Sequence, residues 1–139
     1  MIPGWEHFEH QADIGVRGRG RTEAEAFEQA ALALMAVSVD PARVAGTERV
    51  DVRCEAPDLE LLLVDWLSRL VYEMSARRLI FGKFSVRIDG CRLVGSAWGE
   101  RADSARHEPA VEVKGVSYLA LRVGTDPDGG WVAQCVVDV

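Results

Sequence analysis

The sequence predicts an α+β fold with two layers, in which two amphipathic helices pack on one face of a mostly antiparallel β-sheet. Two segments carry apolar residues at helical spacing, and the first begins with a capping-box pattern. Most of the remaining chain alternates apolar and polar residues, as half-buried strands do. The order is strands, helix, strand, helix and then a run of strands, which favours helices gathered on one side of a sheet.

The first segment, residues 5–20, is expected to be extended. Ile14 and Val16 alternate with polar neighbours, and glycines at positions 15, 18 and 20 disfavour a helix. A glycine at position 15 also allows another part of the chain to approach the backbone closely.

A helix is expected after Thr22. Thr22 is a suitable N-cap and Glu25 follows three residues later, which is the pattern of a capping box. An apolar stripe at helical spacing then consists of Phe27, Ala30, Ala31, Leu34 and Met35. The Asp40-Pro41 pair is expected to end the helix, because the proline ring cannot continue the hydrogen-bond ladder.

A strand and a second helix follow. Residues 50–54 alternate between apolar and charged side chains, which predicts a half-buried strand. Pro57 and Asp58 begin the second helix. Its apolar face is nearly continuous and consists of Leu59, Leu62, Leu63, Trp66, Leu67, Leu70, Val71 and Met74. Arg77 and Arg78 stand where positive charge favours the C-terminal end of a helix dipole.

The rest of the chain is predicted to be β-structure. Asp89-Gly90 is typical of a two-residue hairpin turn. The polar residues 99–109 interrupt the strands, and residues 125–130 are expected to connect a second hairpin. The predicted strands of this half are residues 84–88, 93–98, 113–123 and 131–137.

The composition is that of one compact domain spanning residues 1–139. Hydrophobic residues make up 48% and charged residues 27%, which argues against a disordered chain. Lys and Arg number 16 against 22 Asp and Glu, so the formal net charge is −6. An acidic chain is poorly suited to bind nucleic acid by itself through phosphates, and better suited to bind a metal, a basic protein or a small molecule.

The sequence predicts neither a membrane segment nor export. The longest purely apolar run, residues 30–37, is far shorter than the roughly 20 residues that cross a bilayer. The N-terminus lacks the basic flank and apolar core of a signal peptide. Cys54, Cys91 and Cys135 are widely separated and odd in number, so we expect buried thiols rather than disulfides. A cytoplasmic protein is the resulting expectation.

Carboxylates near the two ends of the chain are more informative than any catalytic motif. The sequence lacks a P-loop, G-x-S-x-G, H-E-x-x-H and C-x-x-C. Asp13 lies between two extended segments and is either a turn former or a ligand. Asp138 follows an apolar strand and precedes the terminal carboxylate of Val139. If folding brings these three together, they repel one another unless a cation such as Ca²⁺, Mg²⁺ or Mn²⁺ binds.

A polar loop and the residue that follows it are further candidates. Residues 99–109 hold three acids, two arginines and a histidine, and form either a solvated loop or a binding loop. Lys114 stands at the head of a strand, where its side chain either reaches solvent or pairs with a carboxylate.

Two basic clusters near the N-terminus have structural and functional interpretations. Arg17, Arg19 and Arg21 could contact RNA phosphates, but the net charge of −6 favours an exposed strand edge. His7 and His10 make zinc conceivable. The lack of a thiolate pair or a third nearby imidazole disfavours it.

Taken in order, these segments resemble the archease family, and the resemblance covers essentially the whole chain. No single segment is decisive, but the ordered set, which closes with an apolar residue after Asp138, is specific. The matching segments are residues 5–15, 22–27 and 58–63, Trp66-Leu67, Gly99-Glu100 with Asp103, His107-Glu108-Pro109, Glu112-Val113-Lys114, residues 131–134 and Asp138-Val139.

The resemblance implies a protein cofactor rather than an enzyme. Archeases assist RtcB-type RNA ligases, which join 2′,3′-cyclic phosphate or 3′-phosphate ends to 5′-hydroxyl ends in tRNA splicing and RNA repair. They promote transfer of GMP to the ligase, so that the ligase turns over repeatedly. RNA is then met only indirectly, through the ligase, and no membrane is involved.

The resemblance also implies functional residues. The family's metal site maps onto Asp13, Asp138 and the terminal carboxylate of Val139, and it takes a divalent ion, Ca²⁺, Mg²⁺ or Mn²⁺. Partner-contact or metal-supporting roles fall to a second set, which consists of His10, Glu100, Asp103, His107 and Lys114.

The chain departs from the family pattern at two positions. Gln11 stands where the family usually has threonine, and its amide can still form a nearby hydrogen bond. Leu119 stands where the family commonly has histidine. This removes a titratable group, so any contribution of that histidine to ligase activation is absent here.

Two other classes of function stay open. A general chaperone or protein modulator would suppress aggregation broadly and without metal. A small metal-dependent hydrolase using Asp13, Asp138 and His107 would turn over a substrate alone, although the sequence offers no evident nucleophile or oriented base.

Overall fold

The computed structural model describes residues 2–103, 107 and 111–139. Within these residues the chain forms two α-helices, one short 3-10 helix and seven β-strands. In chain order the elements are β1 (Gly4–His10), β2 (Asp13–Gly20), α1 (Glu23–Ala36), η1 (Pro41–Arg43), β3 (Glu48–Glu55), α2 (Leu59–Ala76), β4 (Leu79–Asp89), β5 (Arg92–Arg101), β6 (Gly115–Thr125) and β7 (Trp131–Asp138).

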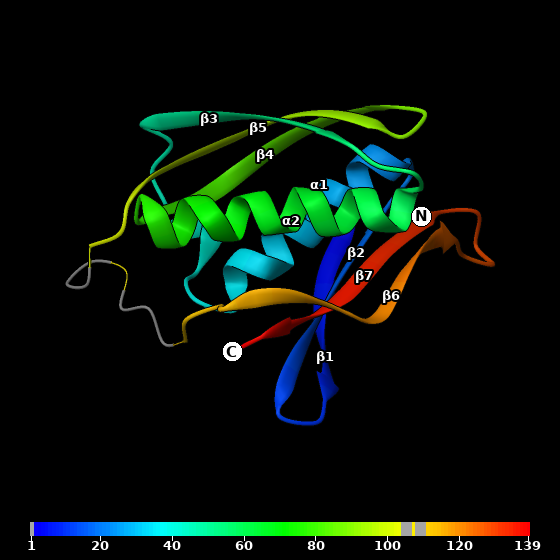
Figure 1. Ribbon diagram of the computed structural model, residues 1–139, viewed down its shortest axis with the longest axis horizontal. Coiled ribbons are helices and arrows are strands. Elements are labelled where there is room, and N and C mark those ends of the chain that lie inside the picture. Colours follow the sequence, from blue (N-terminus) through cyan, green and yellow to red (C-terminus); the bar gives the residue numbers. More distant parts are fainter. Residues whose placement is uncertain (1, 104–106, 108–110) are drawn as a thin grey trace.

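The described strands form two antiparallel sheets, and the helices lie between them (Figure 1). One sheet has the order β1–β2–β7–β6 and the other β3–β5–β4. α1 packs against β2, β1 and β7 on one side and β4 on the other, and α2 packs against β6 and β3. The α+β class and the antiparallel pairing are confirmed. The strands divide into two sheets instead of forming the single sheet expected, so both helices are covered on two sides.

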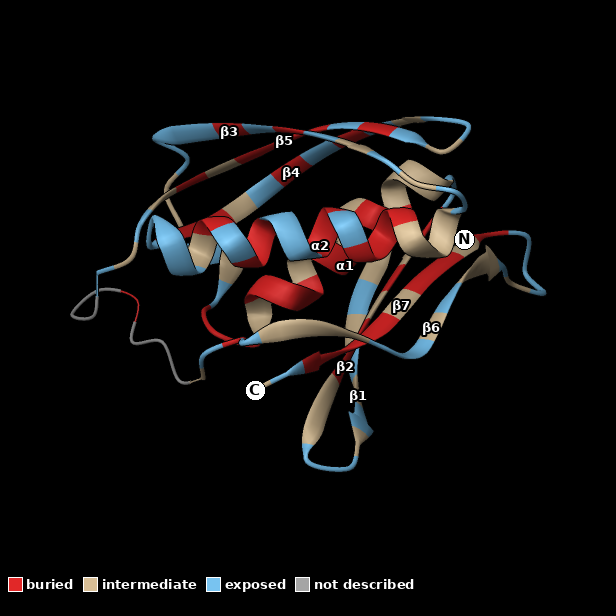
Figure 2. Cartoon of the chain, in the orientation of Figure 1, coloured by how far each residue is buried: buried red, intermediate tan, exposed pale blue. Residues whose placement is uncertain are grey.

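The composition of α1 explains why it can be covered on two sides. Its buried residues extend around the helix and are mostly small: Ala26, Phe27, Ala30, Ala31, Ala33, Leu34 and Met35. A helix that is apolar over most of its surface is stable only when it is enclosed. In Figure 2 the buried positions accordingly concentrate on the helices and on the strand faces that point toward them.

Both helices begin where the sequence predicts, at the expected cap Thr22 and at Asp58, which the structure shows to be the second N-cap. The Thr22 hydroxyl accepts a hydrogen bond from the Glu25 N–H at 3.1 Å, and the Asp58 carboxylate accepts one from the Leu61 N–H at 2.8 Å. In a capping box the Glu25 carboxylate would accept the backbone N–H of Thr22. Here it accepts the N–H of the preceding residue, Arg21, at 2.8 Å. Arg21 also pairs with Glu25 through its side chain.

The helix ends are less well predicted. α1 ends at Ala36, before Asp40, whose carboxylate instead caps η1 by accepting the Ala42 N–H at 3.0 Å. α2 ends at Ala76, and Arg77 and Arg78 follow directly. Arg78 has a φ of 54°, in the left-handed region that commonly terminates helices.

Two turns differ in detail from the expected positions. The segment 5–20 is a hairpin whose turn is Gln11–Ala12, so Asp13 begins β2 and does not form the turn. The β4–β5 turn lies at Gly90–Cys91, one residue later than predicted, with Gly90 at a φ of 62°. β5 continues to Arg101, into the segment expected to be loop.

Trp66 links the two helices and the three-stranded sheet at the centre of the core. Its side chain is fully buried, and its indole N–H donates to the carbonyl of Phe27 on α1 at 3.2 Å. The ring meets Phe84 on β4 edge-on, with centroids 6.1 Å apart. Gly95 on β5 makes room for it, because a Cβ there would lie 2.8 Å from the indole ring.

The three cysteines occupy different environments. Only Cys135 is buried, whereas Cys54 and Cys91 are partly exposed, so the expectation of three buried thiols is wrong for two of them. Burial raises the pKa of the Cys135 thiol to about 12 and also raises the pKa of Cys54. The folded pKa of Cys135 lies above the unfolded value near 8.5. Its contribution to stability is therefore complete below about pH 8.5 and falls as the pH rises toward 12.

The Cys135 thiol is expected to resist alkylation in the folded protein. At pH 8, a pKa of about 12 leaves roughly one thiol in ten thousand as the reactive thiolate. Iodoacetamide labelling followed by peptide mass spectrometry should modify Cys91 first and Cys135 only after denaturant is added. A Cys91→Ser variant should lose the fast phase. Equal labelling rates for Cys91 and Cys135 in the folded protein would contradict the prediction.

No helix among residues 2–103, 107 and 111–139 has both the length and the apolar character needed to span a bilayer.

Candidate functional site

One end of the four-stranded sheet collects residues from all four strands. The register pairs His10 with Asp13 across β1 and β2, and Gly115 with Asp138 across β6 and β7. The β2–β7 register, continued by one step beyond its last pair, sets Asp13 opposite Asp138. Residues directly opposite each other on antiparallel strands point to the same face. The two carboxylates therefore share one face at the end of the sheet.

Val139 lies beside Asp13. Its N–H donates to a carboxylate oxygen of Asp13 at 3.4 Å, across 126 positions of sequence. Asp13 and Val139 are half-buried, and Asp138 is exposed. The fold thus brings the two ends of the chain together at the three residues that the sequence analysis grouped.

Gly115 and Lys114 flank Asp138 on the β6 side. A Cβ at Gly115 would lie 3.6 Å from a carboxylate oxygen of Asp138, so the glycine keeps the space beside that oxygen open. The Lys114 N–H donates to the Asp138 carbonyl at 2.8 Å, and its side chain is exposed. Sequence reasoning singled out Lys114 but missed Gly115. A glycine carries no polar signal, and its place opposite Asp138 is known only from the register.

The carboxylates of Asp13 and Asp138 offer oxygen donors at this end, which suits a hard cation. Within the described part of the chain, no three His, Cys, Asp or Glu side chains gather into a group that could hold a metal. The set at this end contains two side-chain carboxylates, those of Asp13 and Asp138. Oxygen donors are what Ca²⁺, Mg²⁺ and Mn²⁺ prefer, whereas structural zinc sites use sulfur and nitrogen.

Glu100, near the end of β5, forms a second group with Asp103 and His107, which follow the strand. The Glu100 carboxylate accepts the Ala45 N–H at 2.6 Å and pairs with Nε2 of His107 at 3.1 Å. Nδ1 of His107 accepts the Asp103 N–H at 2.9 Å, which leaves the ring proton of the neutral histidine on Nε2.

The bonding of His107 favours a positioning role within the fold. The imidazole is almost fully buried, and both of its ring nitrogens are engaged within the chain. These bonds hold the segment after β5 against the loop that precedes β3. Glu108 and Pro109, which belong to the same polar segment in the sequence, lie outside the described residues.

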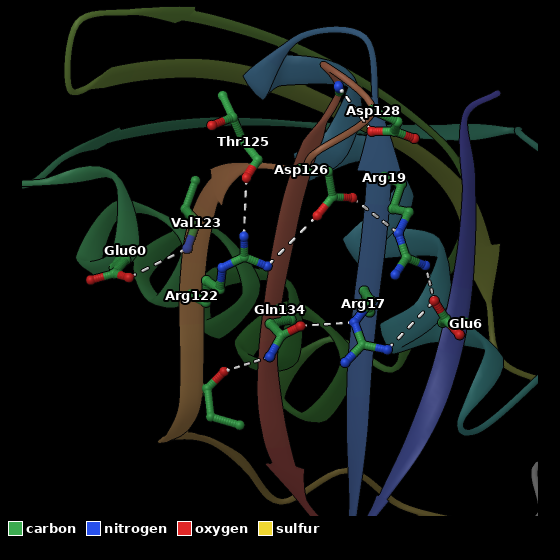
Figure 3. Close-up of polar contacts among 12 residues, drawn as sticks. Glu6, Arg17, Arg19, Glu60, Arg122, Val123, Thr125, Asp126, Asp128 and Gln134 are labelled. Carbon is green, nitrogen blue, oxygen red and sulfur yellow. Dashed lines mark hydrogen bonds and ion pairs between the residues drawn. The ribbon is translucent and has the colours of Figure 1, made fainter. Parts of the chain in front are cut away.

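The arginines of β2 belong to an ionic network on the outer face of the four-stranded sheet (Figure 3). Glu6 pairs with both Arg17 and Arg19, and Asp126 pairs with Arg19 at 3.3 Å and Arg122 at 3.8 Å. The hydrogen bond from Arg19 is the main reason that the pKa of Glu6 is lowered.

This network corrects the expectation of an exposed strand edge. β2 lies between β1 and β7, so Arg17 and Arg19 stand on an internal strand. Arg17 also donates to the Gln134 side chain at 2.7 Å and covers the ring of Phe8, with 4.4 Å between guanidinium carbon and ring centroid. The same ring accounts for Gly15, since a Cβ there would lie 2.3 Å from it.

Comparison with known proteins gives consistent results. Residues 5–139 match the model of the Archease protein family (MTH1598/TM1083). A protein archease from Pyrococcus furiosus is 44% identical over 97% of this chain and 98% of its own length. A protein archease from Thermococcus gammatolerans is 46% identical over the same shares.

A solved structure has a similar fold. The solution structure of protein 1598 from Methanobacterium thermoautotrophicum superposes with a TM-score of 0.85 at 34% sequence identity. The superposition covers 98% of this chain and 99% of that one. The arrangement of two sheets around two helices is therefore shared by a chain that differs at about two thirds of the aligned positions.

Proposed function

Because the chain belongs to the archease family, we propose that it is a non-enzymatic activator of an RtcB-type RNA ligase. In this proposal it promotes guanylylation of the ligase, so that the ligase joins 3′-phosphate and 5′-hydroxyl RNA ends over many turnovers. Its place is the cytoplasm, in tRNA splicing and RNA repair. Family membership is the observation that carries the proposal.

The carboxylate end of the four-stranded sheet is the part we propose to act on the ligase. Asp13, Asp138 and Val139 lie at one sheet end, and the Val139 N–H bonds to the Asp13 carboxylate. Three carboxylates that share such a place repel one another, so the end is poised to take a cation. A bound Ca²⁺, Mg²⁺ or Mn²⁺ would supply positive charge able to offset phosphate charge.

The chain's own groups would orient this end rather than carry out chemistry. The β-ladders on both sides of β7 fix Asp138, and the Lys114 N–H holds its carbonyl in place. The exposed carboxylate of Asp138 can then enter a partner's pocket. His10, the register partner of Asp13, is suited to support the same end.

The test is RNA ligation under multiple-turnover conditions. A cognate RtcB-type ligase, GTP, Mn²⁺ and an RNA pair with 3′-phosphate and 5′-hydroxyl ends are combined with and without this protein. We expect the protein to raise both ligase guanylylation and the number of turnovers. An active ligase that gains nothing would overturn the proposal, and suppression of aggregation without metal would then favour a general chaperone.

A further inference from the structure

The outer face of the three-stranded sheet carries an excess of positive charge in an acidic protein. The β3–β5–β4 registers place five basic and three acidic side chains on this face, whereas the chain has a net charge of −6. The basic residues are Arg49, Arg53, Lys83, Arg87 and Arg92, and the acidic ones are Asp51, Glu55 and Asp89. The fold thus gathers basic residues on one face, although the chain as a whole is acidic.

Three cations of this face form no ion pair with any of the residues that the structure describes. They are Arg53, Lys83 and Arg87, and all three are exposed. This differs from the four-stranded sheet, where Arg17, Arg19 and Arg122 all have an acidic partner. The three-stranded sheet is therefore the better place for an external anion.

One acid of this face, Asp51, is already paired within the sheet. Asp51 accepts hydrogen bonds from the Ser96 hydroxyl and from Arg49, both at 2.8 Å. These two bonds, that from Ser96 first, lower the pKa of Asp51, so the carboxylate stays ionised and paired. It fixes Arg49 beside Trp98, whose ring centroid lies 5.4 Å from the guanidinium carbon.

An aromatic ring stands at one end of the same face. Trp98 is half-buried on the central strand, with the Lys83 ammonium 5.3 Å from its ring centroid. It lines a hollow of about 430 Å³ together with Lys83, Val44, Gly46 and residues at the start of η1. That volume lies within the range of small-ligand sites.

The arrangement of cations and an aromatic ring on this face suits single-stranded nucleic acid, which has a flexible phosphate backbone and flat bases. The central strand carries neutral residues, Trp98, Ser96 and Val94, between the cations of the two edge strands. Arg53 and Arg87 flank Val94, four residues from Trp98, which is about 13 Å at the rise of a β-strand. Cations that follow a backbone next to an aromatic stacking surface are the usual features of single-strand binding.

We propose that the outer face of β3–β5–β4 binds single-stranded RNA, with backbone phosphates on Arg53, Lys83 and Arg87 and one base against Trp98. This revises the expectation that RNA is contacted only through the ligase, which the resemblance implied and the net charge of −6 favoured. The inference rests on the proposed function only in choosing RNA over another polyanion. Its test contains no ligase, so the two can fail separately.

The experiment measures fluorescence anisotropy of a labelled oligouridine of about 12 nucleotides, at salt from about 50 to 200 mM. Replacing both arginines (Arg53→Gln with Arg87→Gln) should weaken binding about tenfold at low salt and reduce the slope of log affinity against log salt by about 1.4. Trp98→Ala should weaken binding roughly tenfold, and Trp98→Phe should restore most of the loss, because a phenyl ring still stacks.

The matched control is Arg19→Gln with Arg122→Gln, which gives the same net charge but changes the other sheet. It should bind RNA as tightly as the unchanged protein. Circular dichroism melts confirm that every variant is folded. Equal weakening by both double variants would overturn the proposal, as would undetectable binding. Tighter binding of polyglutamate than of oligouridine would also overturn it, and would assign the face to an acidic protein.

Discussion

The Asp138→Asn variant is expected to lose the ability to stimulate multiple-turnover RNA ligation. The substitution keeps the size of the side chain and removes one of the carboxylates that we propose as metal donors. Loss of one anionic oxygen donor should lower the affinity for a divalent ion by at least about tenfold. Altering residues around metal sites has effects of this size. We expect the ligase to return to its unstimulated turnover at matched protein concentration.

The fold of this variant should be intact. Asp138 is exposed, and the contact from Lys114 is made to its carbonyl, which asparagine retains. Removing one of three neighbouring negative charges should leave the melting temperature unchanged or slightly higher without metal. Added Ca²⁺ or Mn²⁺ should raise the melting temperature of the unchanged protein, and less so that of the variant.

Asp58→Asn provides the matched control. It makes the same change of charge at the N-cap of α2, where the asparagine carbonyl can still accept the Leu61 N–H. This control should stimulate the ligase fully. Deleting Val139 should act like Asp138→Asn, because it shifts the terminal carboxylate and removes the N–H that bonds Asp13. Full stimulation by either Asp138→Asn or the deletion would show that the carboxylate end is not the active part.

The secondary structure could largely be predicted from the sequence because its signals are local. Thr22 and Asp58 cap their helices within three residues of chain, and strand alternation needs only a few positions. The end of α1 was misplaced for the opposite reason. Proline at position 41 prevents α1 from continuing through that position but does not require α1 to extend that far, and the chain turns at residues 37–39.

The division into two sheets could not be predicted, because pairing between distant strands leaves no local pattern. β2 lies beside β7, more than a hundred residues away, and the same apolar alternation would suit a single sheet. The basic face of the three-stranded sheet could not be predicted for a related reason. Arg53 and Arg87 are far apart in sequence and meet on one face only after β5 pairs with both of their strands.

The candidate site could be predicted only in part. The chemistry of Asp13 and Asp138 was evident from residue type, but that they meet depends on the β2–β7 register. The resemblance to a family supplied that juxtaposition before the structure did. His107 shows the limit of this reasoning, since its two internal hydrogen bonds place it with Glu100 and Asp103 in a separate group.

The second large effect is expected from Gly18→Ala, which should prevent stable folding. A Cβ at Gly18 would lie 2.2 Å from the backbone nitrogen of Ala30 and 2.3 Å from the carbonyl oxygen of Ala26. Both atoms belong to the backbone of α1, which the other sheet holds from its far side, so the helix cannot simply move away. We expect a loss of at least about 3 kcal/mol in the free energy of unfolding, measured by urea denaturation.

Alanine substitutions at two other glycines serve as controls. They distinguish the effect of the close packing at Gly18 from a general effect of replacing glycine. Gly15→Ala should cost less, because the obstructing atoms belong to the ring of Phe8, a side chain on the outer face that can rotate. Gly4→Ala should be neutral or slightly stabilising, because nothing lies within 4 Å and alanine reduces the entropy of the unfolded chain. Equal stability of the Gly4 and Gly18 variants would mean that α1 does not pack directly on the backbone of β2. The strand that carries Asp13 to the C-terminal residues would then be positioned by its β-ladders alone.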